Sequence, residues 1–319
     1  MSKIKKILCP TDWSEPSRVA LEAATKMARY EDADLVLLHV LPPLGLVYGM
    51  ASAVSLGQVV QDEATEKLRA LIAECVPPDV RAQPLIRVGD EADEIHLAAL
   101  QADVVVMSTH GRAGWAHWAF GSVAETVMRE AVCPIFVLGP LGQDSATSEA
   151  GLSGRGCRVD FPYQQVLWPT DWSEASERAL DKAIAISTHH GAQLLMLHVI
   201  EAPELEMGWL HEEHMEKRLR RLCKRKAGAQ NARRLLGHGV AATEIVRIAA
   251  AESIDLIVMS THGSNGWQSL RLGSVVQKVL REVPCPVFLV PHLDATPPAE
   301  TPPAETPPAE LPIETVLDI

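Results

Sequence analysis

The sequence predicts an α/β fold, a doubly wound parallel five-stranded sheet that is present in two tandem copies. Short apolar runs alternate with segments of helical periodicity along the chain, which is the pattern of parallel strands joined by helices. Four landmarks also recur in the same order in the two halves of the 319-residue chain. A repeat of this kind indicates the duplication of one domain.

The four repeated landmarks match closely. They are the hexapeptide Pro-Thr-Asp-Trp-Ser-Glu (10–15 and 169–174), the tripeptide Leu-His-Val (38–40 and 197–199), a glycine-bearing loop that opens with Met-Ser-Thr-His-Gly (107–111 and 259–263) and the helix-like segment behind that loop (124–131 and 276–283). Their common order predicts one fold twice, with corresponding positions in each copy.

Five apolar runs of the first half are the expected strands, and four helical patterns lie between them. The strands are expected at 3–9, 35–40, 80–88, 104–108 and 134–138, and the helices after Ser14 and at 58–75, 91–100 and 124–131. Ser14 is a suitable N-cap, and Pro16 is tolerated in the first turn of a helix. Continuous apolar runs are typical of strands covered on both faces, so we expect a central sheet with the strand order 3-2-1-4-5.

The second half repeats this plan with one shortened segment. Val40 precedes Glu94 by 54 positions, whereas Val199 precedes Glu244 by only 45. The shortened segment includes the region of the third strand, so the second sheet is predicted to lack this strand or to keep only a stub. The basic helix expected before it, 210–236, is interpreted as a solvated face or as a docking surface for an acidic partner.

Composition divides the chain into four parts. They are a first domain (1–140), a linker (141–161), a second domain truncated at strand three (162–293) and a tail (294–319). The linker is rich in Gly, Ser and Ala and has no apolar periodicity. The tail contains three Thr-Pro-Pro-Ala-Glu units, and its proline density favours an extended, disordered segment.

Charge and composition argue against several classes of protein. The formal net charge is −12 and the pI is near 5.5, so a nucleic-acid partner is not expected. The six cysteines form no Cys-x-x-Cys pair, which favours free thiols in a reducing compartment. Neither a signal peptide nor an apolar run of roughly 18 to 20 residues is present, so we expect a cytoplasmic protein without a membrane partner.

Two separate signals converge on one crevice in each half. In a sheet of order 3-2-1-4-5, ligands bind outside the carboxyl ends of strands one and four, where the winding direction reverses. Asp12 leaves the first strand there, and Ser108 and Gly111 leave the fourth. The glycine-bearing loop then enters a helix, an arrangement that lets backbone N–H groups approach an anion. The sequence therefore predicts a phosphate-binding crevice, and it predicts it twice.

At this point the chain resembles the tandem universal stress proteins over both halves, with the linker and tail left out. The ATP-binding branch of that family carries Gly-x-x-Gly-x9-Gly-Ser/Thr after strand four. Here the motif aligns as Ser108-x-x-Gly111-x9-Gly121-Ser122 and as Ser260-x-x-Gly263-x9-Gly273-Ser274. Serine replaces the first glycine in both copies, where it either crowds the ribose or donates a hydrogen bond to it.

The resemblance implies an adenine-nucleotide site in each half, for ATP (or ADP or AMP) with Mg²⁺ carried by the phosphates. Asp12 and Asp171 would lie by the adenosine, beside Pro10, Thr11, Pro169 and Thr170. Val40 and Val199 would offer backbone groups to the adenine edge. The phosphates would be contacted by Gly111, Gly121, Ser122, Gly263, Gly273 and Ser274. Arg112 can neutralise a phosphate, and Ser264 stands in its place in the second copy.

The resemblance also implies pairing through strand five, either between the two halves of one chain or between two chains in a homodimer. The pairing edges would be 134–138 and 286–290. The function implied is that of a stress-response regulator. Its bound nucleotide would order the glycine-bearing loop and so change a surface that faces an unidentified protein partner.

Several candidate residues also have purely structural interpretations. Ser122-x-x-Glu125 and Ser274-x-x-Gln277 fit capping boxes. Asp12 and Asp171 can cap the turns that follow them. His39 and His198 end apolar runs and are expected to be core histidines with satisfied hydrogen bonds.

An enzyme is not expected, beyond weak ATP hydrolysis. The sequence offers no evident nucleophile–base pair, no Walker lysine and no second carboxylate near the crevice to hold a metal ion. Two other functions stay open. One is a protein–protein interaction module in which the loop is only structural, and the other is a slow ATP hydrolase.

Overall fold

The computed structural model describes residues 3–43, 50–109, 120–139, 159–201, 209–263 and 272–291. In the first half, strands and helices alternate as the sequence predicts. They are β1 (Lys6–Pro10), α1 (Glu15–Glu31), β2 (Asp34–Leu41), α2 (Met50–Cys75), β3 (Ala82–Val88), α3 (Glu91–Ala99), β4 (Val104–Ser108), α4 (Ser122–Arg129) and β5 (Ile135–Leu138).

The second half repeats this order of elements. They are β6 (Gln165–Thr170), α5 (Glu174–His190), β7 (Gln193–Ile200), α7 (Trp209–Arg225), β8 (Arg233–His238), α8 (Ala241–Ala251), β9 (Leu256–Ser260), α9 (Ser274–Glu282) and β10 (Val287–Val290). Ser14 and Ser173 are the N-caps of α1 and α5, and each hydroxyl accepts a backbone N–H three residues on, as expected for Ser14.

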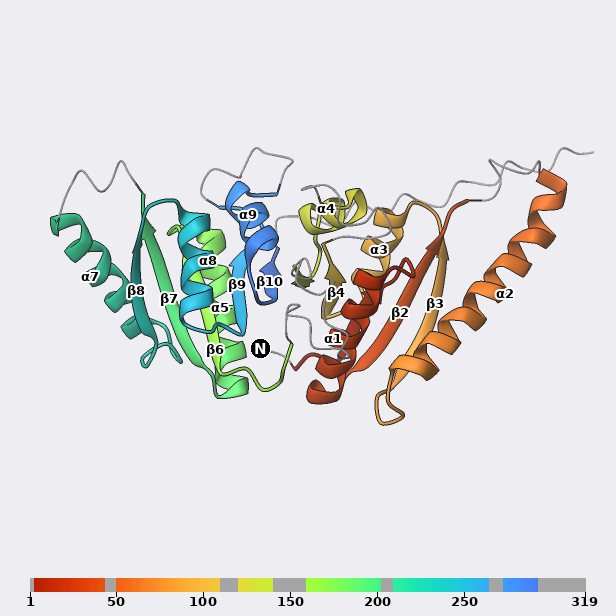
Figure 1. Cartoon of the computed structure of the whole chain (residues 1–319), viewed down its shortest axis with the longest axis horizontal. Coiled ribbons are helices and arrows are strands. Elements are labelled where there is room, and N and C mark those ends of the chain that lie inside the picture. The colour runs from red at the N-terminus through yellow and green to blue at the C-terminus, as the bar shows by residue number, and fades with distance from the viewer. Residues whose placement is uncertain are drawn as a thin grey trace, which may run out of the picture.

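The strands form one ten-stranded sheet with the order β3-β2-β1-β4-β5-β10-β9-β6-β7-β8. Within each half the paired strands are parallel, and they follow the predicted order 3-2-1-4-5. Figure 1 shows the two halves side by side, with β5 and β10 near the centre. The predicted fold class is therefore confirmed, and each half carries one copy of it.

The two halves meet through β5 and β10, which pair antiparallel with Phe136 opposite Phe288. Both phenylalanine side chains are buried, and both belong to the same layer of the core. Of the two pairings left open by the sequence, the structure shows the one between the halves of a single chain.

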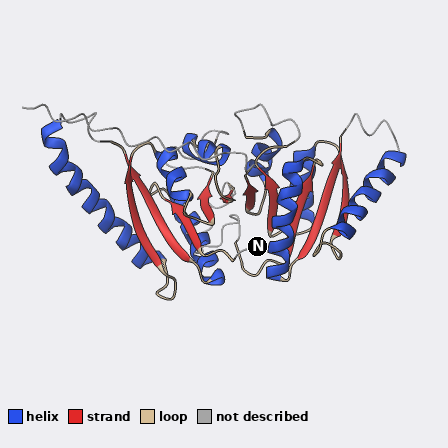
Figure 2. Cartoon of the chain, turned by 180° about the vertical axis from the view of Figure 1, so that it is seen from behind, coloured by secondary structure: helices blue, strands red, loops and turns tan. Residues whose placement is uncertain are grey.

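Helices cover both faces of this sheet, as Figure 2 shows. On one face, Leu21 of α1 and Leu68 of α2 pack in the same layer as Leu180 of α5 and Leu219 of α7. The helices α3, α4, α8 and α9 contribute their apolar residues to the layer on the other face. Each layer contains residues of both halves, so the halves share a core and are expected to stabilise each other.

The second half contains a third strand, so the prediction that it lacks one is wrong. β8 pairs in parallel with β7 over six residues, from Leu195 opposite Arg233 to Ile200 opposite His238. The missing residues come from the preceding helix, because α7 has 17 residues and α2 has 26. At 1.5 Å per residue, the nine-residue difference makes α7 about 14 Å shorter than α2. The two helices lie at the outer edges of the molecule in Figure 1.

The helix expected at 210–236 also ends earlier than predicted. Gly228 follows α7 with a φ of 87°, a left-handed conformation that stops the helix. A Cβ at Gly228 would lie 2.6 Å from Cγ2 of Ile184, so the chain needs glycine at this close approach to α5. The turn after Gly228 leaves room for β8.

The described cysteines, Cys9, Cys75, Cys133, Cys223 and Cys285, are free thiols. Burial raises the pKa of Cys9 and of Cys133 to about 12, so neither is a reactive thiolate at neutral pH. Within the described ranges, no helix combines the length and the apolarity that crossing a bilayer requires.

Candidate functional site

A cavity of about 380 Å³ lies at the carboxyl ends of β1, β2 and β4 in the first half. Seven of the residues predicted from the sequence line it: Pro10, Thr11, Asp12, Val40, Ser108, Gly121 and Ser122. Four separate segments of the chain thus reach one hollow at the switch point of the sheet, where ligands of this fold bind. Two further predicted residues, Gly111 and Arg112, lie outside the described residues.

One wall of the cavity is the N-terminus of α4. The N-cap is Gly121, with a φ of −60°, and glycine has no side chain of its own with which to cap the helix. The backbone N–H of Gly121 donates to the carbonyl of Thr109 at 3.1 Å, which ties the start of the helix to the end of β4. The first turn of a helix has N–H groups without partners in the helix and carries the positive end of its dipole, so this wall can receive an anion.

The capping-box interpretation of Ser122 and Ser274 is wrong. Both serines are the first helical residues, because the N-cap is one position earlier, at Gly121 and Gly273. The N–H of Glu125 bonds to the carbonyl of Gly121 at 2.9 Å, as in an ordinary first turn. Ser122 lines the cavity.

The turn after β1 also lines the cavity. Oδ1 of Asp12 accepts the backbone N–H of Ser14 at 3.0 Å and its hydroxyl at 2.5 Å. This is the Asx turn that the residue types allow. Asp12 also lines the cavity, so the same residue caps the turn and contributes to the cavity wall.

Trp13, the next residue, has a left-handed backbone that the sequence did not predict. Its φ is 71°, and Trp172 in the second half has a φ of 64°. This region costs a bulky residue roughly 1–2 kcal/mol, so other contacts must hold it. The indole N–H of Trp13 donates to Nε2 of His39 at 3.1 Å, and the ammonium of Lys67 lies 4.1 Å from the ring centroid.

His39 is a core histidine with satisfied hydrogen bonds, as expected. Its Nε2 accepts the indole N–H of Trp13, so the ring proton sits on Nδ1 and is donated to the carbonyl of Thr11 at 2.8 Å. His198 repeats both contacts, with the carbonyl of Thr170 at 2.9 Å and the indole of Trp172 at 3.2 Å. These neutral rings position the turn at each crevice.

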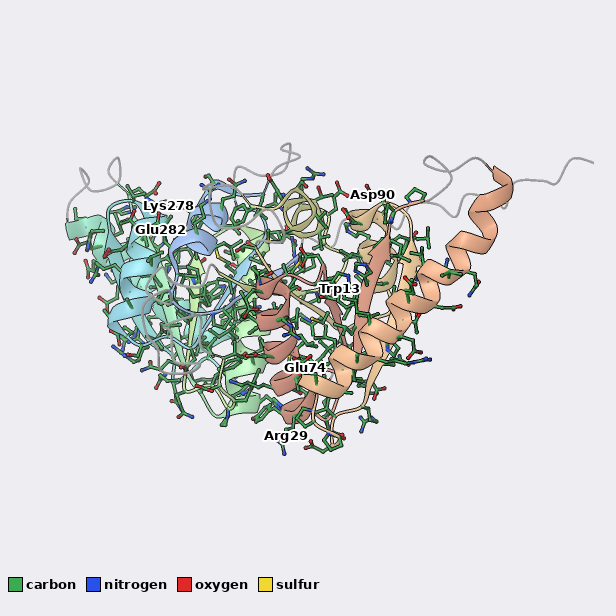
Figure 3. All side chains as sticks on the ribbon, turned by 45° about the vertical axis from the view of Figure 1, so that its right-hand side comes forward. Trp13, Arg29, Glu74, Asp90, Lys278 and Glu282 are labelled. Atoms are coloured by element: carbon green, nitrogen blue, oxygen red, sulfur yellow. The ribbon has the colours of Figure 1, made fainter. Side chains whose placement is uncertain are left out.

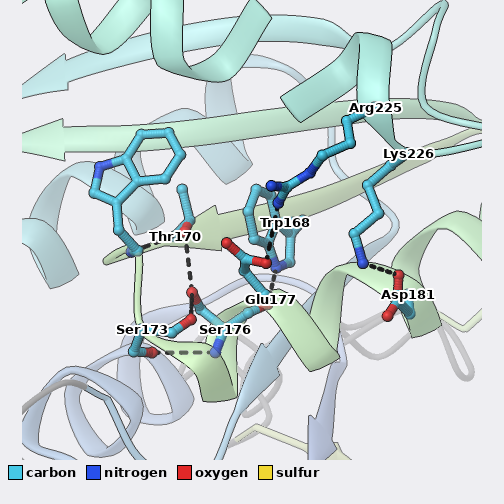
Figure 4. Close-up of polar contacts among 9 residues, drawn as sticks. Trp168, Thr170, Ser173, Ser176, Glu177, Asp181, Arg225 and Lys226 are labelled. Atoms are coloured by element: carbon cyan, nitrogen blue, oxygen red, sulfur yellow. Dashed lines mark hydrogen bonds and ion pairs between the residues drawn. The ribbon is translucent and has the colours of Figure 1, made fainter. Parts of the chain in front are cut away.

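The second half builds the equivalent turn in the same way. Thr170 and Ser176 share a hydrogen bond of 3.0 Å between their hydroxyls, and Ser173 caps the helix beneath them (Figure 4). Gly263 approaches the turn so closely that a Cβ would lie 2.6 Å from Oδ2 of Asp171. The loop after β9 and the turn after β6 therefore meet.

The other predicted residues of the second half occupy positions equivalent to those in the first. Pro169 lies near the end of β6, Val199 in β7, Ser260 at the end of β9, and Gly273 and Ser274 at the start of α9. The hydroxyl of Ser260 donates to the carbonyl of His262 at 2.6 Å, so the serine that replaces the first glycine of the motif braces the loop.

The two crevices differ at the helix that follows the third strand. In the first half, Asp90 caps α3 by accepting the N–H groups of Ala92 and Asp93, and Glu91 lines the cavity. Asp90 lies at the upper edge of this half in Figure 3. In the second half, Val240 and Ala241 stand in these places, and Oε1 of Glu201 accepts the N–H of Ala241 at 3.1 Å.

These features define a duplicated doubly wound α/β protein with a cavity at the switch point of the first half and equivalent turns at that of the second. The Universal stress protein family matches residues 3–139 and 162–291, and the chain belongs to that family.

Relatives and solved structures agree with this assignment. A universal stress protein of Mycolicibacterium smegmatis is 26% identical over 300 residues, covering 89% of this chain and 96% of that protein. One from Thermus aquaticus is 38% identical over 135 residues, 40% of this chain and 98% of its own. The structure of a universal stress protein from Archaeoglobus fulgidus covers 90% of this chain and 98% of its own with a TM-score of 0.63 at 20% identity, which shows the fold.

Proposed function

We propose that this protein binds an adenine nucleotide, ATP or its ADP or AMP product, and acts as a cytoplasmic stress-response regulator rather than as an enzyme. One observation carries the proposal. Residues from four segments of the chain, all predicted nucleotide contacts, line one cavity of about 380 Å³ beside the N-terminus of α4. This volume lies in the range of small-molecule sites.

The lining of the cavity suggests how a nucleotide would lie. Leu38, Val40 and Pro42 offer an apolar surface for the base, and Asp12 offers a carboxylate to the ribose hydroxyls. The start of α4 offers backbone N–H groups and the Ser122 hydroxyl to phosphate oxygens. Mg²⁺ would then be carried mainly by the phosphates.

A regulatory role follows from where such a nucleotide would sit. Its phosphates would face the loop of residues 110–119, which joins β4 to α4 and contains Gly111 and Arg112. A ligand that contacts this loop favours one conformation of the loop and so changes the surface that the loop offers to a protein partner. The size of this shift is set by the difference in the affinity of the ligand for the two conformations. The equivalent loop in the second half, 264–271, would respond in the same way.

Ser122→Glu tests the site without weakening the helix. A carboxylate in the first turn is favourable to the helix dipole, so the fold should be kept. The same charge repels phosphate, and we expect ATP affinity at that site to fall by at least about tenfold. Calorimetric titration with ATP, ADP, AMP and GTP, together with mass spectrometry of nucleotide released on denaturation, measures the affinity and the stoichiometry.

Ser274→Glu is the matched control in the second half. Each single variant should remove one equivalent of nucleotide, and the double variant should remove both. Absence of binding by the unmodified protein, or equal binding by all variants, would contradict the proposal and favour the interaction module. Phosphate release from ATP that disappears in Asp12→Ala would instead support the slow hydrolase.

A further inference from the structure

A second cavity, of about 640 Å³, lies between the two halves on the face covered by α1 and α5. Met27 and Phe136 of the first half line it, and so do Tyr163, Ile184 and Phe288 of the second. None of the residues that line the nucleotide cavity belongs to it. In Figure 1, α1 and α5 flank the centre of the molecule near the N-terminus.

Three groups with metal-ligating atoms gather at this cavity. Glu31 is the last residue of α1, and His189 and His190 are the last two residues of α5. One ligand atom from each of the three lies within 4.8 Å of the other two. Nε2 of His189 lies 3.1 Å from Oε1 of Glu31, so the carboxylate of one half already contacts an imidazole of the other.

The burial and the chemistry of these groups suit a metal ion. The Glu31 side chain is only 6% exposed and lies among the residues that line the cavity. Carboxylate oxygens and imidazole nitrogens are ligands that divalent transition metals accept. Lys3 also lines the cavity, and its ammonium is half-exposed and lies 3.8 Å from the carboxylate of Asp32.

The surrounding aromatic rings fix the orientation of both histidines. Tyr30 stacks on His190 with the ring centroids 4.7 Å apart and the planes 10° apart. Tyr163 lies against the same ring at 4.5 Å, and His189 meets Tyr30 edge to face at 5.6 Å. Such support is typical of ligand residues, whose orientation is set by their neighbours.

We propose that Glu31, His189 and His190 bind one divalent transition-metal ion, Zn²⁺ by preference, which joins the two halves of the chain. Two imidazoles and one carboxylate are a known ligand set for Zn²⁺ with a fourth position left open, here toward the cavity. Bonds of 2.0–2.2 Å place tetrahedral ligands roughly 3.3 Å apart, so the side chains would close in by about 1.5 Å or less.

Binding replaces one existing contact. The backbone N–H of Tyr163 donates to Nδ1 of His190 at 3.3 Å, near the long end of the range for such bonds. Coordination of His190 exchanges this hydrogen bond for a metal–nitrogen bond. A metal at Nε2 leaves the ring proton on Nδ1, which then cannot accept the N–H of Tyr163, and a metal at Nδ1 takes the lone pair that accepts it.

The duplication explains how such a site can be asymmetric. Glu31 and His190 both end a 17-residue helix, so they are equivalent positions in the two halves. Two identical chains would bring identical residues together here. In a tandem chain, one half supplies the carboxylate and the other supplies both imidazoles.

The test uses the full-length protein after treatment with a chelator and buffer exchange. Calorimetric titration with ZnCl₂ should show one equivalent of tight binding, and CoCl₂ should give the visible absorption of a four-coordinate site. Glu31→Gln and His190→Phe should each weaken Zn²⁺ binding by at least about 100-fold, since each removes a ligand. Phenylalanine keeps the ring that stacks on Tyr30, and glutamine keeps the shape of Glu31, so both variants should fold.

His238→Gln is the matched control, because His238 and Glu212 form an exposed pair at 2.8 Å that can also attract metal ions. This variant should bind Zn²⁺ as the unmodified protein does. Metal should raise the Tm of the unmodified protein and of this control, and leave the two site variants unchanged. Equal binding by all four proteins, or no binding by the unmodified one, would overturn the proposal.

Discussion

The two halves of the chain agree most closely in the turn that follows their first strand. The hydroxyls of Thr11 and Ser17 lie 3.0 Å apart, as do those of Thr170 and Ser176. The indole–imidazole hydrogen bonds measure 3.1 and 3.2 Å. These contacts hold the backbone at each crevice, whatever each crevice receives.

The halves differ at the rim of the crevice and at the outer helix. Glu91 lines the first cavity where Ala241 stands in the second half, and α2 is nine residues longer than α7. Backbone-positioning contacts are thus kept in both copies, while a side chain at the rim of the first cavity and the length of the outer helix differ. The comparison predicts two crevices of equal architecture and unequal chemistry.

The largest expected effect comes from the strands that join the halves. Phe136→Ala removes a fully buried ring at the β5–β10 pair and should lower the free energy of unfolding by about 3–5 kcal/mol. Because the core is shared, we expect one cooperative transition in urea, shifted as a whole. Far-UV circular dichroism and tryptophan fluorescence would follow it.

Leu97→Ala is the control, since Leu97 is 51% exposed and its loss should change stability by less than about 0.5 kcal/mol. If Phe136→Ala instead moved only the first of two separate transitions, the halves would be independent folding units. The view of a common core would then have to be abandoned.

A smaller and matched effect is expected from the two turns. Thr11→Val and Thr170→Val keep the shape of the side chain but leave the backbone N–H of Trp13 or Trp172 without the hydroxyl that accepts it at 3.2 or 3.0 Å. Each should cost about 1–3 kcal/mol of unfolding free energy. The two costs should agree within about 0.5 kcal/mol, because the sites are far apart and built alike. A clear inequality would show that the two turns are not equivalent.

The smallest effect is expected at the outer edges of the sheet. Arg81 pairs with Asp32 and Asp34, and Arg233 pairs with Glu252. The arginine hydrogen bonds lower the pKa of Asp32 and of Glu252 in the folded protein. A lowered carboxyl pKa stabilises the fold at pH values above the ordinary carboxyl pKa, and this contribution disappears as the pH falls through the lowered value.

Arg81→Gln and Arg233→Gln should therefore reduce the Tm slightly at pH 7, and the difference should shrink in acid and in about 0.5 M NaCl. Thermal melts of both variants at each condition measure it. A Tm difference that grew in acid, or that ignored salt, would rule out these ion pairs as its source.

The strand order and seven cavity residues could be predicted because each rests on a local pattern. Apolar runs, glycine spacing and a repeated Pro-Thr-Asp turn are all visible in short windows of sequence. The third strand of the second half was missed because Arg233-Arg-Leu-Leu236 fits a helical continuation, and the nine missing residues were assigned to the strand instead of the helix. Gly228 was the residue in the sequence that signals the end of this helix, and the structure gives it a positive φ.

Other features depend on contacts between segments that the sequence does not place. The helix after the loop begins one residue earlier than a capping box at Ser122 requires, with Gly121 as its N-cap and the N–H of Gly121 bonded to the carbonyl of Thr109 after β4. The left-handed Trp13 depends on His39, which arrives from the next strand. Glu31 and His190 meet only because the two central strands pair, and the sequence alone left open whether that pairing lies within one chain.

The pairing of β5 with β10 has a consequence for copy number. A dimer made of separate chains comes apart on dilution and can exchange its subunits. Here the partner strand is tethered, so its effective concentration is set by the linker and stays the same at any level of expression. A cell that makes this protein obtains one copy of each half per chain, in fixed proportion.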